Sequence, residues 1–147
     1  MGHIRVAIAM DEALNLEKVF RALERGDRKI SVAGLNMAAR AYFLARAFES
    51  LGKSMVVVAP NGDEAEKFVS DLRFFLEPEA PLSGWSQKVF LLPDYEVLPF
   101  QGISPAVEVT ARRLGALYAM LAGTKPILVV ASAAAAMQRV LPASHPA

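Results

Sequence analysis

The sequence predicts an α/β fold in which helices cover a mainly parallel β-sheet. Four short runs rich in branched residues are apolar nearly throughout, as is typical of parallel strands buried on both faces. These runs are residues 29–33, 54–59, 88–92 and 126–131. Segments with helical periodicity separate them, and this alternation of strand and helix favours the α/β class with right-handed crossovers.

The helical segments carry their own start and stop signals. The helix after the first strand is expected to end at Gly52, a residue suited to the left-handed conformation that follows many helices. Asn61 with Glu64 three residues later predicts a capping box for the next helix. Ser104 as cap and Pro105 as first helical residue predict the start of the helix before the last strand.

Apolar residues at helical spacing predict which side of each helix faces the core. Shorter helices are expected over 12–25 and 133–140. The expected inward faces are Leu16, Val19, Phe20 and Leu23; Met37, Ala41, Leu44, Ala45, Phe48 and Leu51; Ala65, Phe68, Val69, Leu72, Phe75 and Leu76; and Val107, Ala111, Leu114, Leu117, Tyr118 and Leu121.

Composition narrows the function classes. The 147 residues are 54% hydrophobic and 21% charged, with a net charge of +1 and no cysteine. The sequence therefore excludes disulfides, Cys-ligated zinc and thiol nucleophiles, and it predicts no bulk attraction to nucleic acid. No apolar run approaches the ~18 residues of a membrane span, so we expect a cytoplasmic protein with no membrane partner. The predicted domains are a helical lead-in (1–27), an α/β domain (28–141) and a linker or artificial chain end (142–147).

The loop after the first of these four strands stands where nucleotide hydrolases bind phosphate. A working loop reads G-x-x-x-x-G-K-[ST], whose lysine reaches the phosphates and whose hydroxyl holds magnesium. Here Gly34 is followed by Asn36, Met37 and Ala38, with no lysine between positions 29 and 53 and no serine or threonine between 31 and 50. Arg40 is a poor substitute, because it falls inside the helix and lacks a hydroxyl partner. The loop predicts no bound cofactor.

No other catalytic or metal-binding group emerges. The last strand runs into Ser132 and alanines where an acidic magnesium ligand would be needed, and His3 and His145 are isolated at the two ends. Asp94 and Glu96 form a weak carboxylate pair, for which a solvated or capping role is commoner. The doublet Arg112–Arg113 is compatible with phosphate contact, but a solvent-facing or inter-domain role is favoured, which makes it a possible partner face.

Five short segments together carry a family resemblance. Residues 94–100 read DYEVLPF, and ISP at 103–105 and RLGALY at 113–118 follow in order. DLRFF at 71–75 and MQRVLP at 137–142 complete the pattern. Over about 29–142 the chain resembles the N-terminal, UvrB-like domain of the bacterial transcription-repair coupling factor (Mfd) family.

The resemblance implies a P-loop-NTPase-like (RecA-like, UvrB domain 1a-like) layer with a degenerate nucleotide loop. It also implies a non-catalytic scaffold that supports UvrA recruitment through the following domain, within an ATP-dependent DNA translocase that meets RNA polymerase and DNA through distant domains. Two alternatives remain open: a fragment of a UvrB-like superfamily-two helicase that still binds nucleotide, and a free-standing Rossmann-like binding module. The signature loop, expected to lie over the carboxyl edge of the sheet, comprises Asp94, Tyr95, Glu96, Leu98, Pro99 and Phe100.

Overall fold

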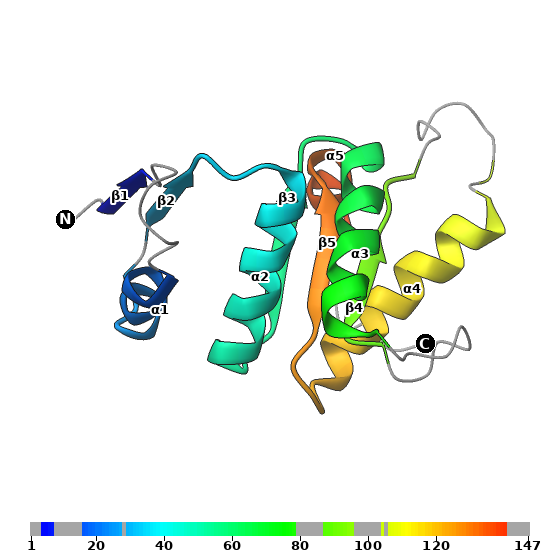
Figure 1. Cartoon of the computed structure of the whole chain (residues 1–147). Helices are drawn as coiled ribbons and strands as arrows, with labels where there is room; N and C mark the ends of the chain where they lie inside the picture. The colour runs from blue at the N-terminus through cyan, green and yellow to red at the C-terminus, as the bar shows by residue number, and fades with distance from the viewer. Residues whose placement is uncertain are drawn as a thin grey trace. The chain divides into compact units, whose positions relative to one another are not determined.

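The computed structural model describes residues 4–7, 16–27, 29–78, 87–95, 104 and 106–140. The chain divides into two compact units, Met1–Gly52 and Lys53–Ala147, which are described separately (Figure 1). No described helix has the length and apolar character needed to cross a membrane. The domain boundaries expected at 27/28 and 141/142 stay predictions.

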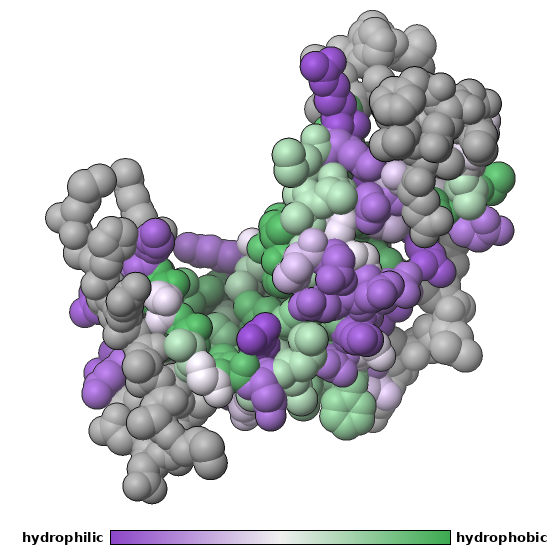
Figure 2. Space-filling model, turned by 90° about the horizontal axis from the view of Figure 1, so that it is seen from above, coloured by the Kyte–Doolittle hydropathy of each residue, from purple (hydrophilic) through white to green (hydrophobic). Residues whose placement is uncertain are grey.

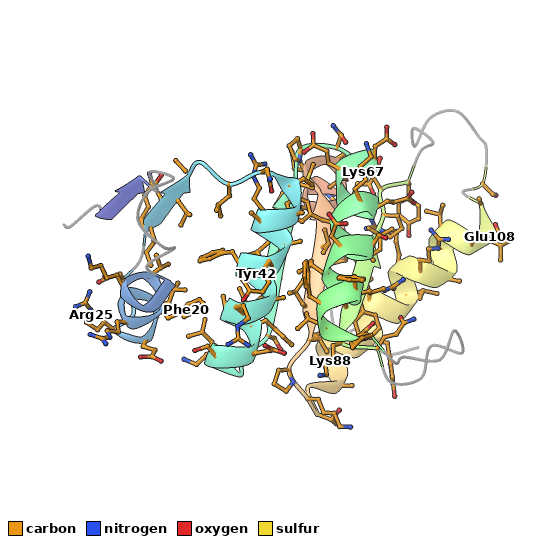
Figure 3. All side chains as sticks on the ribbon, in the orientation of Figure 1. Phe20, Arg25, Tyr42, Lys67, Lys88 and Glu108 are labelled. Atoms are coloured by element: carbon orange, nitrogen blue, oxygen red, sulfur yellow. The ribbon has the colours of Figure 1, made fainter. Side chains whose placement is uncertain are left out.

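The first unit is built on a two-stranded parallel sheet. Ile4 lies opposite Ile30, and Ala7 lies opposite Ala33. The two helices of this unit contact each other through the stacked rings of Phe20 (labelled in Figure 3) and Phe43, whose centroids are 6.0 Å apart. Its elements are β1 (Ile4–Ala7), α1 (Leu16–Glu24), β2 (Ile30–Ala33) and α2 (Met37–Leu51).

The second unit is a three-stranded parallel sheet with strand order β3-β5-β4. The central strand β5 is buried at every residue. Helix α3 packs against all three strands and crosses in front of the sheet in Figure 1, while α4 packs along β4 and α5 along β5. The elements are β3 (Met55–Ala59), α3 (Gly62–Leu76), β4 (Val89–Leu92), α4 (Val107–Ala122), β5 (Leu128–Ser132) and α5 (Ala133–Met137).

The α/β class predicted from the sequence is confirmed. Three of the four predicted strands form one parallel sheet, whereas the run ending at Ala33 pairs instead with β1. Strand β1 is not predicted from the sequence, because a four-residue strand that includes Arg5 is too short and too polar to stand out.

Two predicted helix ends are confirmed and one is wrong. Gly52 ends α2 in the left-handed conformation (φ 57°) and donates its N–H to the Phe48 carbonyl. The Glu64 N–H donates to Asn61 Oδ1 at 2.9 Å, as the capping box predicted. Helix α4, however, begins at Val107 after an Ala106 cap that makes no side-chain hydrogen bond, so Ser104 is not its cap.

The inward faces predicted for α2 and α3 are confirmed, but the face predicted for α4 is wrong. Val107, Leu114, Tyr118 and Leu121 are 79%, 61%, 74% and 68% exposed. The residues of α4 that are buried are Arg113 and Ala116. A small residue such as Ala116 lets the helix approach β4 closely, so the strand takes the side of α4 with the smaller apolar groups.

Candidate functional site

The loop that joins β2 to α2 is closed by its own side chains. Gly34 adopts a positive φ of 85°, which a residue with a side chain rarely adopts and which lets the chain turn into the helix. Asn36 then caps α2, its Oδ1 accepting the Ala39 N–H at 2.8 Å. Arg40 donates from Nε back to the Leu35 carbonyl at 3.1 Å.

These contacts occupy one backbone N–H and one cationic side chain at the start of α2. A phosphate loop depends on backbone N–H groups that stay free at a helix N-terminus until the ligand arrives. In this loop the Asn36 side chain already holds the Ala39 N–H, and Arg40 is turned toward a backbone carbonyl. Met37 and Ala38 begin the helix and contribute neither a cation nor a hydroxyl. The geometry is that of an ordinary capped helix.

The carboxyl ends of β4 and β5 hold a second polar group of residues. Ser132, the last residue of β5, donates from Oγ to Asp94 Oδ1 at 2.9 Å, and the same Oγ accepts the Ala135 N–H at 3.0 Å to cap α5. Asp94 Oδ1 also lies 3.7 Å from the position that a Cβ on Gly62 would take, beside the first turn of α3. A carboxylate is favourable there, because the N-terminus of a helix carries partial positive charge.

Tyr95 is held at the same edge through its backbone. Its N–H donates to Gln138 Oε1 at 3.0 Å, and Gln138 Nε2 donates to its carbonyl at 3.3 Å. One side-chain amide therefore satisfies both backbone groups of a residue that has left the sheet. This reciprocal pair fixes the direction in which the chain leaves β4.

Arg113 completes this group from helix α4. It is only 1% exposed, its Nη1 donates to the Pro93 carbonyl at 2.5 Å, and its Cζ lies 4.3 Å from the centroid of the Tyr95 ring. Within the described part of the chain, its Nε and Nη2 have no hydrogen-bond partner. The carboxyl-edge cluster comprises Pro93, Asp94, Tyr95, Arg113, Ser132 and Gln138.

The hydrogen bonds of the carboxyl-edge cluster mainly join helices and strands of this unit to one another. The Ser132 hydroxyl is used both as donor and as acceptor, so its hydrogen is directed at a carboxylate that is itself held at a helix start. No histidine stands beside it among the described residues, and no group of three potential metal ligands occurs in the same part of the chain. Each hydrogen bond of the cluster joins one element of this unit to another.

Arg112 and Arg113, predicted as a possible partner face, differ in exposure. The two residues do not share a surface, because Arg113 turns inward under Tyr95 while Arg112 stays at the surface. Arg112 forms an ion pair with Glu66 of α3 at 3.6 Å, with both side chains more than half exposed. Such a pair is screened by solvent and contributes little to stability.

Other predicted residues cannot be placed. Glu96, Leu98, Pro99 and Phe100 of the signature loop lie outside the described residues, as do His3 and His145. Ser132 and Gln138 were not predicted as partners of the loop. The available signal was their polar character beside apolar runs, together with the position of Gln138 inside the MQR segment.

Comparison with known proteins supports the resemblance stated above. No family model matches the chain. The transcription-repair-coupling factor of Myxococcus xanthus is 36% identical over 118 residues, which make up 80% of this chain. The chain is related to a segment of the transcription-repair coupling factors. It spans about 10% of the length of that relative.

Proposed function

We propose that the chain is a non-catalytic, UvrB-like scaffold layer of a transcription-repair coupling factor. In this role it supports recruitment of UvrA by the domain that follows, in transcription-coupled nucleotide excision repair in the cytoplasm. The observation that carries the proposal is the carboxyl-edge cluster. Asp94 accepts a hydrogen bond from Ser132 of β5, and Arg113 of α4 binds the Pro93 carbonyl and the Tyr95 ring, so these signature residues join the strands and helices of the unit.

The phosphate loop supports the same proposal. Asn36 satisfies a helix amide, Arg40 binds a backbone carbonyl, and the loop carries neither the lysine nor the hydroxyl of a working site. The ATP-driven translocation that characterises the family, and contacts with RNA polymerase and DNA, are accordingly assigned to distant parts of the parent protein.

The proposal predicts that the chain does not bind ATP with magnesium. Calorimetric titration with millimolar nucleotide is expected to give only the heat of dilution, because no cation or hydroxyl is available at the loop. A saturable isotherm with a Kd below roughly 100 μM, worth about 5.5 kcal/mol, would favour the helicase-fragment alternative instead.

The proposal also predicts that this chain alone does not capture UvrA. A pull-down with purified UvrA should compare the chain with a form of the parent protein extended by about a hundred residues, a typical domain length. Only the extended form is expected to retain UvrA. Equal retention by both forms would place the binding surface inside this chain, and Arg112→Glu, an exposed change on α4, would be the first variant to map it.

A further inference from the structure

The short helix α5 has little packing of its own to hold it in place. It consists of four alanines followed by Met137, and Ala135 is the residue that is buried. Met137 is 86% exposed. A helix of this length does not form by itself in water, because so few turns do not offset the cost of starting a helix. Contacts with the rest of the unit must therefore hold α5.

Two neighbouring residues that follow β4 hold the two ends of α5. At its start, Ser132 accepts the Ala135 N–H and donates to Asp94. At its end, the side-chain amide of Gln138 binds both the N–H and the carbonyl of Tyr95. Figure 1 shows α5 at the carboxyl end of β5, and Figure 2 shows the molecule from above, with polar side chains at the surface among apolar ones. The chain that leaves β4 therefore brackets α5.

The Gln138 amide is the contact that sets the direction of the chain after α5. Gln138 is the C-cap residue, with extended backbone (φ −74°, ψ 139°) and its own N–H bound to the Ala135 carbonyl at 3.2 Å. The next two residues, Arg139 and Val140, are exposed, so burial does not fix their path. Their direction depends on the residue before them, and the side chain of that residue is bound to Tyr95.

The geometry of the amide makes this contact directional. A side-chain amide offers an acceptor on one side and a donor on the other, so a single orientation of Gln138 satisfies both backbone groups of Tyr95. Tyr95 is in turn held from α4, because its ring lies 4.3 Å from Cζ of Arg113, which is 1% exposed. Two hydrogen bonds to an anchored residue define an orientation, which one bond would not.

We infer that Gln138 is a positioning residue, whose amide, bound to Tyr95, sets the direction in which the chain leaves this layer after α5. The inference rests on the proposed scaffold function, in which the domain that follows recruits UvrA. Loss of the two hydrogen bonds raises the population in which the amide is detached by about 5- to 30-fold. The layer then still folds, but it presents the following domain in many directions.

Distances between two spin labels test the inference in this chain without UvrA. The chain has no cysteine, so Phe74→Cys on α3 and Val140→Cys after α5 place the labels at sites that are 74% and 51% exposed. Double electron–electron resonance should give one narrow distance distribution. Gln138→Ala should broaden it. Gln138→Glu should broaden it too, because a carboxylate accepts the Tyr95 N–H but has no hydrogen to donate to the carbonyl.

Asn61→Ala is the matched control for a general loss of stability. It removes the cap of α3, a hydrogen bond of the same unit that does not involve the Gln138 amide, and it should leave the distribution narrow. The inference would be overturned by a distribution that stays narrow in both Gln138 variants, that is broad before any substitution, or that broadens equally with Asn61→Ala.

A pull-down distinguishes this inference from the proposed function. At a concentration of UvrA near half saturation, the extended form with Gln138→Ala is expected to retain several-fold less UvrA than the unsubstituted extended form, whereas Asn61→Ala should retain as much. Equal retention with Gln138→Ala would overturn the positioning role. An unsubstituted extended form that retains no UvrA would contradict the proposed function, and the distance measurement would still decide whether Gln138 directs the chain.

Discussion

The contact between Tyr95 and Arg113 predicts a measurable coupling energy. The guanidinium Cζ lies 4.3 Å from the ring centroid, and Arg113 is 1% exposed, so the cation is desolvated over the ring. A desolvated cation–π contact contributes about 2 kcal/mol. The perturbation is a double-mutant cycle with Tyr95→Leu, Arg113→Met and the double variant, each of which keeps an apolar side chain of useful size.

The cycle isolates this contact from the others that Arg113 makes. Arg113→Met also removes the hydrogen bond to the Pro93 carbonyl, a charge-assisted bond of about 1.5–3 kcal/mol. It also removes the two buried donors that lack a partner in the described part of the chain, which offsets part of that loss. Both effects occur with and without the Tyr95 ring, so they cancel in the coupling energy.

Urea unfolding followed by circular dichroism gives the four free energies of unfolding. We expect a coupling of about 1.5–2 kcal/mol. The control pairs Tyr95→Leu with Arg112→Met, whose side chain is exposed and bound to Glu66, and it should give less than about 0.5 kcal/mol. A Tyr95–Arg113 coupling as small as the control would refute the structural role assigned to Arg113.

Two further substitutions test the remaining contacts. Ser132→Ala removes both the bond to Asp94 and the cap of α5 at a site that is 1% exposed; it should lower the free energy of unfolding by about 2–3 kcal/mol, and a loss below about 0.5 kcal/mol would contradict the cluster. Asn36→Ala removes the cap of α2 and should destabilise the chain by about 1 kcal/mol without creating ATP binding; unchanged urea midpoints would show that the cap contributes nothing.

The sequence predicted where helices and strands occur better than it predicted which elements pack against each other. For α2 and α3 the apolar spacing identified both the helix and its buried side, since each has one apolar face. Helix α4 has two such faces, and periodicity alone does not tell which of them packs on the sheet. Ala116, 0% exposed, marks the side of α4 that packs on the core, with Leu117 and Ala119 partly buried beside it.

The sequence predicted only some residues of the carboxyl-edge cluster, because it does not show which elements pack against each other. The resemblance to the coupling factors points to Asp94, Tyr95 and Arg113, but the sequence alone favours a solvent-facing or inter-domain role for the Arg113 side chain. Its burial depends on Tyr95 and on the Pro93 carbonyl, which are 18 and 20 residues away in sequence. The pairing arises from the packing of α4 on β4, and local sequence patterns do not reveal which helix packs on which strand.

The carboxyl ends of β4 and β5 differ from a ligand site in how their polar groups are hydrogen-bonded. A nucleotide-binding edge keeps donors free until phosphate arrives. Here Ser132 holds Asp94, and Gln138 holds both backbone groups of Tyr95. A phosphate would have to break such bonds before it could form its own, and each costs about 1 kcal/mol or more to replace. The Arg113 donors that lack a partner among the described residues are buried beneath the Tyr95 ring. Polar groups that bind one another in this way support the proposed scaffold role.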